Sequence, residues 1–129
     1  MINIGDKHTE QFIVTDEIVR IFAEITGDKN PIHLDDEYAA TTPFGKRIAH
    51  GILVSGFISN ILANKLPGPG TIYLKQELNF IAPVFIGDAV EVVVEVIDKK
   101  EGKPVYTLNT LCSTKGKPVI NGFAIVKFE

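Results

Sequence analysis

The stretch "GILVSGFISNILANKL", residues 51–66, decides the fold expected for this sequence. Apolar residues would lie on nearly every side of a helix formed by this stretch, and such a helix is normally buried in a protein core. A membrane span is the first alternative. The run is shorter than the roughly 20 apolar residues that a bilayer requires, and it carries Asn60, Asn64 and Lys65. We therefore expect residues 51–66 to form a central helix that ends at "PGPG", residues 67–70.

The sequence after this helix changes to the two-residue period of β-strands. In "TIYLKQELNF", residues 71–80, apolar and polar side chains alternate. Three further stretches are β-branched and aromatic and are separated by the turn sequences "KKEGK" and "KGK": residues 89–98, 104–114 and 118–128. These short links predict an antiparallel sheet, because none is long enough for a helical crossover. The expected fold is α+β, with a curved antiparallel sheet wrapped around one long helix.

Two shorter helices are expected before the central one. Residues 15–26 are amphipathic, with Thr15 as the expected N-cap and Gly27 as the stop. Their apolar side chains fall at i, i+3, i+4 and i+7 and would share one face: Ile18, Ile21, Phe22 and Ile25. Residues 35–42 predict a short helix that ends before Pro43.

Composition limits the class of protein. The chain has 129 residues with 45% hydrophobic and 22% charged side chains, which predicts one globular domain over residues 1–129. A net charge of -3 argues against a nucleic-acid partner, and no basic amphipathic stretch suggests a membrane partner. The single Cys112 excludes an internal disulfide and fits a reducing cytosol. The first residues show no secretory signal, so we expect a cytoplasmic protein.

The first candidate site is "TGDKNPIH", residues 26–33. Asp28 and His33 are five residues apart with a proline between them, so a rigid turn could bring their side chains together. A carboxylate beside an imidazole can pass protons near neutral pH. Alternatively, Asp28 and Asn30 only make local turn bonds, and His33 is a partly buried structural residue. From these residues alone both interpretations stay open.

The second candidate site is the start of the central helix. Gly51 lacks a side chain, so a ligand oxygen could approach its backbone N–H at the positive end of the helix dipole. The alternative is a tight helix entry with His50 near the N-cap. Further along, Ser55 and Ser59 are polar positions on an apolar helix, and such serines usually bond back to the preceding turn. Cys112 is expected to be core packing.

Two segments together resemble a known family. "FAEITGDKNPIHLDDEYAATTPF" (22–44), followed by "IAHGILVSGFIS" (48–59), resembles the hydratase-2 motif of MaoC-like, R-specific enoyl-CoA hydratases, and the resemblance continues through "LPGPGTIYLKQELNFIAPVFIGD" (66–88). It implies a hot-dog fold and a homodimer whose sheets join edge to edge. The implied activity belongs to acyl-CoA and fatty acid metabolism: reversible syn addition of water to a trans-2-enoyl-CoA to give the (R)-3-hydroxyacyl-CoA. The resemblance implies no metal and no redox cofactor, with coenzyme A part of the substrate.

The resemblance also implies roles for individual residues. Asp28 and His33 are the catalytic pair: Asp28 orients the water and acts as base, while His33 shares the water and delivers the C2 proton. The N–H of Gly51 is the expected oxyanion donor. Three residues are expected to support the site: Asn30, His50 and Ser59. For the coenzyme A phosphates no clear cluster exists. The candidates are Lys46, Arg47 and Lys75, and solvated surface charge is the simpler interpretation of any one of them.

Other functions compete with this one. The nearest is a dehydratase acting on (R)-3-hydroxyacyl thioesters of an acyl-carrier protein, which shares the fold and the transition state. A hot-dog thioesterase fits less well, because such enzymes usually place an acidic residue on the central helix and residues 51–66 contain none. A metal site built from Asp28, His33 and His50 has plausible ligand types. A non-catalytic acyl-thioester-binding module is the remaining alternative.

Overall fold

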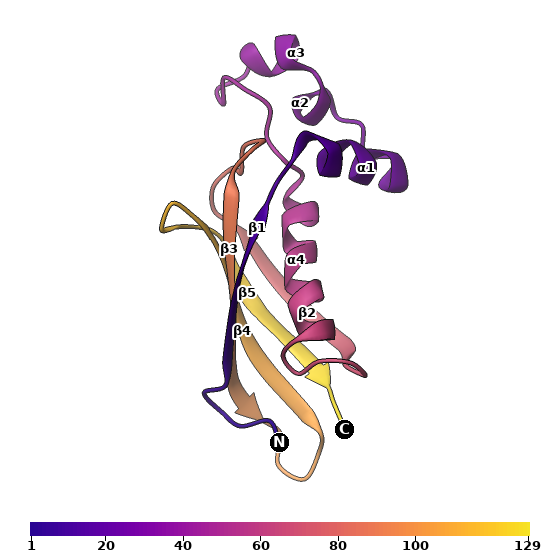
Figure 1. Cartoon of the computed structure of the whole chain (residues 1–129), viewed down its shortest axis with the longest axis vertical. Coiled ribbons are helices and arrows are strands. Elements are labelled where there is room, and N and C mark those ends of the chain that lie inside the picture. The colour runs from indigo at the N-terminus through magenta and orange to yellow at the C-terminus, as the bar shows by residue number, and fades with distance from the viewer.

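The computed structural model describes residues 1–129. One antiparallel sheet holds all five strands, in the order β1-β3-β4-β5-β2. Their bounds are β1 (Lys7–Ile13), β2 (Ile72–Phe80), β3 (Ala89–Lys99), β4 (Val105–Thr114) and β5 (Lys117–Lys127). The long helix α4 (Gly51–Asn64) runs along the sheet and packs on it (Figure 1). A central helix held in an antiparallel sheet is the hot-dog arrangement, so the predicted fold is confirmed.

The core lies between α4 and the sheet. It contains 21 buried apolar residues, and α4 contributes five of them: Leu53, Val54, Ile58, Ile61 and Leu62. β3 alternates as a half-buried strand should, with every second side chain inside. Cys112 is fully buried on β4, where its strand neighbours are Val92 and Ile120. Burial raises the pKa of its thiol to about 12, so the prediction of core packing for Cys112 is confirmed.

The first strand is absent from the sequence-based prediction. β1 pairs with β3 along its whole length, at one edge of the sheet. Its sequence is "KHTEQFI", in which only the last two side chains are strongly apolar. An edge strand with one face in water needs few apolar residues, and β1 therefore lacks the alternation that marks the other four strands.

The sequence predicts a central helix that is buried on nearly every side, but the structure leaves one side of it uncovered. Ile52 is 58% exposed, and one face of α4 remains open. The other edge strand, β2, likewise leaves Ile72, Leu74 and Phe80 more than half exposed. The reason is geometric, because a single sheet can cover only one side of a helix. On the first helix the predicted apolar face is confirmed only in part: Ile18 and Phe22 pack against the core, whereas Ile25 is 78% exposed.

Three short helices lie together beyond one end of the sheet (Figure 1): α1 (Asp16–Thr26), α2 (Pro31–Leu34) and α3 (Asp36–Ala40). We call residues 15–50 the end region, and α4 with the five strands the frame. Thr15 caps α1 and Gly27, in the left-handed conformation, ends it, as predicted. α2 was not predicted from the sequence. No helix of the protein has the length and apolar character that crossing a bilayer requires.

Candidate active site

Asp28 and Asn30 shape the turn between α1 and α2. The carboxylate of Asp28 accepts a hydrogen bond from the backbone N–H of Asn30 at 3.3 Å. The side-chain oxygen of Asn30 in turn accepts from the N–H of Ile32 at 3.2 Å, which makes Asn30 the N-cap of α2. The local bonds of the structural interpretation are therefore present. They leave the second carboxylate oxygen of Asp28, an exposed residue, free for a further partner.

His33 is buried on α2, with 8% of its surface exposed. Its Nδ1 lies 2.7 Å from the backbone carbonyl of Ile48. A carbonyl can only accept, so Nδ1 carries the hydrogen and Nε2 is the atom free to exchange a proton. Burial lowers the pKa of His33 below its usual 6.5, and neighbouring His50 lowers it too, while the bond to Ile48 and the charge of Asp28 act in the opposite direction. His33 is therefore neutral at pH 7.

His50 joins the turn to the central helix. It is the N-cap residue of α4 and is 2% exposed. Its Nε2–H donates to the backbone carbonyl of Asp28 at 3.0 Å, and its ring stacks on that of His33 with 3.8 Å between the centroids. The ring of Phe22 also packs against the His50 ring, with 4.8 Å between the centroids. His50 thus contacts both members of the predicted pair, the backbone of Asp28 and the ring of His33, as a residue that supports the site would.

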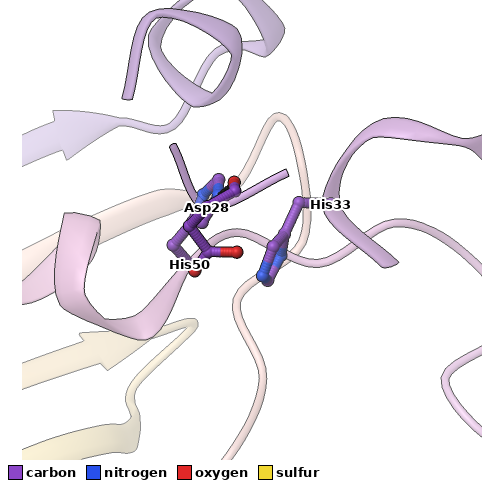
Figure 2. Close-up of side chains that lie close together, drawn as sticks. All are labelled: Asp28, His33 and His50. Carbon is purple, nitrogen blue, oxygen red and sulfur yellow. Dashed lines mark hydrogen bonds between the residues drawn. The ribbon is translucent and has the colours of Figure 1, made fainter. Parts of the chain in front are cut away.

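Asp28, His33 and His50 come together at one place (Figure 2). One ligand-type atom from each lies within 4.8 Å of the others. A metal ion must lie near the plane of each imidazole that binds it. The two rings are stacked at 3.8 Å and tilted by only 29°, so their planes do not meet close to either ring. This arrangement does not fit both histidines to one ion, and it suits a proton-transfer pair better.

Gly51, the first residue of α4, lies beside an apolar pocket of about 340 Å³. The pocket is lined by Phe44, Ile48, Gly51, Phe80, Ile81, Ala82 and Pro83. A Cβ at Gly51 would come within 2.6 Å of ring carbons of Phe80, so any side chain here would displace that ring. Because Phe80 is more than half exposed, its ring has room to move, and glycine is what lets it lie against the helix start. Gly51 also presents a backbone N–H of the first helical turn, where no intrahelical partner exists.

The remaining predicted residues have different outcomes. Ser55 bonds back to the carbonyl of Ile52 at 2.7 Å, as expected of a mid-helix serine. Ser59 is half-buried two turns beyond Gly51 and makes no hydrogen bond to the three clustered residues, so its supporting role stays a prediction. The Lys46 ammonium lies over the ring of Phe85 at 4.6 Å.

Arg47 is the residue whose role the sequence did not reveal. It had been considered as a phosphate ligand or a solvated charge, and both interpretations are wrong, because Arg47 is 7% exposed and bound to neighbouring groups inside the protein. Its partners include the backbone of His33. The only sequence signal was its place three residues before His50 in a stretch leading to a buried helix.

The fold and the site define a class: a hot-dog protein with a carboxylate and an imidazole at the start of its central helix. The chain belongs to the MaoC like domain family, whose model matches residues 5–116. It is 54% identical over 106 residues to a 3-hydroxybutyryl-CoA dehydratase of Methylorubrum extorquens, covering 82% of this chain and 68% of that protein. It is 46% identical over 113 residues to an (R)-specific enoyl-CoA hydratase of Rhodospirillum rubrum, covering 88% and 78%.

A solved structure of a related protein supports the same family. The (R)-hydratase from A. caviae involved in PHA biosynthesis superposes with a TM-score of 0.97 at 41% identity, covering 99% of this chain and 98% of that one. The predicted family is therefore confirmed, and the relatives are named as hydratases or dehydratases.

Proposed function

We propose that this protein is an R-specific enoyl-CoA hydratase, a hydro-lyase that adds water reversibly to trans-2-enoyl-CoA. The observation that carries the proposal is the meeting of the Asp28 and His33 side chains beside the N-terminus of α4. An apolar pocket for part of an acyl thioester adjoins the same helix end at Gly51. The names of the relatives, which include hydratase and dehydratase of 3-hydroxyacyl-CoA chemistry, support the same reaction.

The chemistry follows from the two side chains. Water is held between the Asp28 carboxylate and Nε2 of His33, and its oxygen attacks C3 of the enoyl thioester. Because Nδ1 is already committed to Ile48, a neutral His33 has only an acceptor at Nε2. The pair takes one proton from the water, and His33 then delivers that proton to C2 from the same side. The addition is therefore syn, and the two groups titrate together as one unit.

The negative charge that develops on the thioester oxygen needs a donor. The N–H of Gly51 lies at the positive end of α4 and beside the pocket. Removing one such donor typically costs about 10²–10³ in rate. Asn30, by capping α2, and His50, by holding the Asp28 carbonyl, keep the pair in place. We assign Ser59 a supporting role on the basis of the family resemblance alone.

We further propose that the enzyme works without a metal or redox cofactor, in the cytoplasm and as a homodimer. No step above needs an added group, and the stacked rings of His33 and His50 do not fit an ion. The dimer is supported by the apolar side chains that edge strand β2 and helix α4 leave exposed: Ile52, Ile72, Leu74 and Phe80. A second copy joining at β2 would cover them.

The test is hydration of crotonyl-CoA, followed by loss of the conjugated enoyl-thioester absorbance. We expect fast turnover, and a loss of about 10²-fold or more in Asp28→Asn and in His33→Ala, while both variants stay folded. Asp35→Asn is the matched control: Asp35 caps α3 through its side-chain oxygen, and asparagine preserves that bond. A stereospecific dehydrogenase should identify the R product.

Two results would redirect the proposal. No turnover with crotonyl-CoA or longer enoyl-CoAs would favour a carrier-protein thioester as substrate, or a binding module. An S product would contradict the assignment.

A further inference from the structure

Arg47 is a buried cation at the junction of the three short helices. Its side chain is 8% exposed, and a buried charge is strongly unfavourable unless it is paired and hydrogen-bonded. Each of its terminal nitrogens faces a carboxylate: one donates to Asp16 at the start of α1, and the other lies 3.9 Å from Asp36 on α3. Its remaining donor, Nε–H, points at α2.

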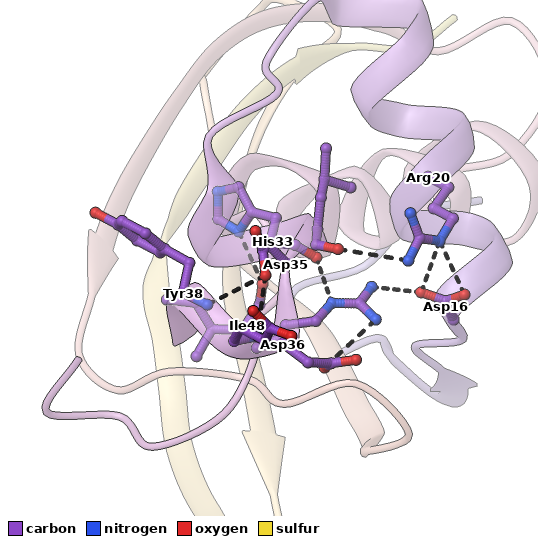
Figure 3. Close-up of polar contacts among 10 residues, drawn as sticks. Asp16, Arg20, His33, Asp35, Asp36, Tyr38 and Ile48 are labelled. Carbon is purple, nitrogen blue, oxygen red and sulfur yellow. Dashed lines mark hydrogen bonds and ion pairs between the residues drawn. The ribbon is translucent and has the colours of Figure 1, made fainter. Parts of the chain in front are cut away.

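That third bond reaches a residue of the catalytic pair. Nε of Arg47 donates to the backbone carbonyl of His33 at 2.8 Å. The next residue, Ile48, accepts the ring Nδ1–H of His33 at 2.7 Å and donates its own N–H to the carbonyl of Ile32 at 3.2 Å. Residues 47 and 48 therefore hold the backbone and the ring of His33 at once. Figure 3 shows His33 and Ile48 in this network, with Asp16 beyond them.

His33 needs such external support. It lies on α2, which has only four residues, and a single helical turn is not stable by itself. Asp28, its partner, lies in the turn that joins α1 to α2. By bonding Asp16 on α1 and His33 on α2, Arg47 connects the two helices on either side of Asp28. The relative position of the two catalytic groups therefore depends on this guanidinium.

We propose that Arg47 is a positioning residue for the hydration reaction: it fixes His33 against Asp28 through the His33 carbonyl and the carboxylate of Asp16. The inference rests on the proposed function, in which His33 exchanges a proton through Nε2. Arg47 touches no substrate atom in this account. Its loss should therefore lower kcat and leave KM nearly unchanged, because the misplaced groups act in the chemical step.

Arg47→Lys is the main test variant. Lysine keeps the charge near Asp16, but a single ammonium cannot reproduce the planar fork that reaches the His33 carbonyl as well. We expect kcat for crotonyl-CoA to fall by about tenfold or more, with KM changed less than about twofold. Arg47→Met removes charge and fork together and should reduce kcat at least as far. If it does not fold, the lysine variant still decides the matter.

Arg20→Met is the matched control for charge. Arg20 also binds Asp16, through Nε at 3.0 Å, and its terminal nitrogen makes a long bond of 3.5 Å to the carbonyl of Leu34, but it does not touch His33 and its side chain is half exposed. Exposed pairs of this kind contribute little, so kcat should stay within about twofold of the unchanged protein. A loss in Arg20→Met equal to that in Arg47→Lys would overturn the proposal, because Arg20 makes no bond to His33 and the effect would then follow from a disturbed Asp16 rather than from the lost bond to the His33 carbonyl.

A second readout separates this inference from the proposed function. Nitrogen-15 NMR of the histidine rings reports which nitrogen of His33 carries the hydrogen, whether or not the protein hydrates any thioester. The unchanged protein should show hydrogen on Nδ1, and Arg47→Lys should show a mixture of both tautomers. Unchanged His33 signals in Arg47→Lys, or a raised KM with kcat intact, would overturn the positioning role. If the wild-type protein lacks hydratase activity but Arg47→Lys changes the His33 tautomer as expected, only the proposed function fails.

Discussion

The frame and the end region of this molecule are held together by different forces. The frame is a sheet paired strand by strand around α4, and it supplies 16 of the 21 core residues. The end region contributes only Val19 and Ala49 to that core. Its short helices depend on side-chain caps and on a polar network around Arg47. The candidate active site lies where the two parts meet.

This difference separates stability from catalysis. Burial of apolar area is spread over many contacts and has no preferred direction, so the frame supplies most of the free energy of folding. Hydrogen bonds are directional and few, so the end region can fix the angles of Asp28 and His33. Substitutions in the frame should therefore reduce stability first, and substitutions in the end region should reduce activity first.

The largest effect on stability is expected in the frame. Ile58 on α4 is fully buried, so Ile58→Ala should lower the free energy of unfolding by about 2–5 kcal/mol. The kcat of the remaining folded protein should be close to that of the wild type. Ile97→Ala, at a half-exposed position on β3, is the control and should change stability by less than about 0.5 kcal/mol. Urea unfolding measures both, and equal losses would contradict the assignment of the core.

A smaller effect on stability with a distinct effect on activity is expected at Asn30. Removing this cap in Asn30→Ala should lower the free energy of unfolding by about 1 kcal/mol and should reduce kcat as well, because α2 carries His33. Asp35→Ala removes the comparable cap of α3. It should cost similar stability and leave kcat largely intact. If the two variants lose kcat equally, then the cap of α2 has no special part in placing His33.

The smallest effect on stability is expected at Asp16, the half-exposed carboxylate of the polar network around Arg47. Hydrogen bonds from Arg47 and then Arg20 lower the pKa of Asp16 below its usual 3.8. A carboxyl with a lowered folded-state pKa stabilises the protein above the unfolded value, and this stabilisation is lost as pH falls through the folded value. The free energy of unfolding of Asp16→Asn should therefore lie below that of the wild type in neutral solution. The two values should converge at pH well below 3.8.

Urea unfolding over a pH series measures this convergence. Asparagine keeps a side-chain oxygen that can accept from Arg47, and Asp16 is half exposed, so the difference should be small and sensitive to salt. Glu101→Gln, in the exposed turn after β3, is the control and should run parallel to wild type at every pH. Parallel curves for Asp16→Asn as well would show that the ion pair with Arg47 does not contribute to stability.

The frame could be predicted closely because its signals are local. Four strands and α4 carry long periodic patterns, and the turn residues between them are unambiguous. β1 was missed because an edge strand with polar side chains carries little pattern. The prediction of a fully covered central helix was wrong, because sequence periodicity does not tell how far the sheet of one chain extends. Ile52 remains exposed.

The site was predictable only in part. Asp28, Asn30 and His33 lie in one turn sequence, so their proximity could be inferred from the chain itself. The stacking of His50 on His33 joins residues 17 positions apart in the sequence, and only the packed structure shows it. Arg47 illustrates the limit most clearly. An arginine between Lys46 and Ile48 resembles a surface charge in the sequence, and its burial depends on three separate helices meeting around it.

The central claim is that Asp28 and His33 act as one unit, and a double-mutant cycle on kcat tests it most directly. Groups that share one proton transfer are grossly non-additive, so the double variant Asp28→Asn/His33→Ala should be about as slow as either single variant. The account predicts that outcome, with all three proteins folded and with about 10²-fold or greater loss in each single variant. Losses that multiply in the double variant, or a single variant with wild-type kcat, would contradict a shared catalytic pair.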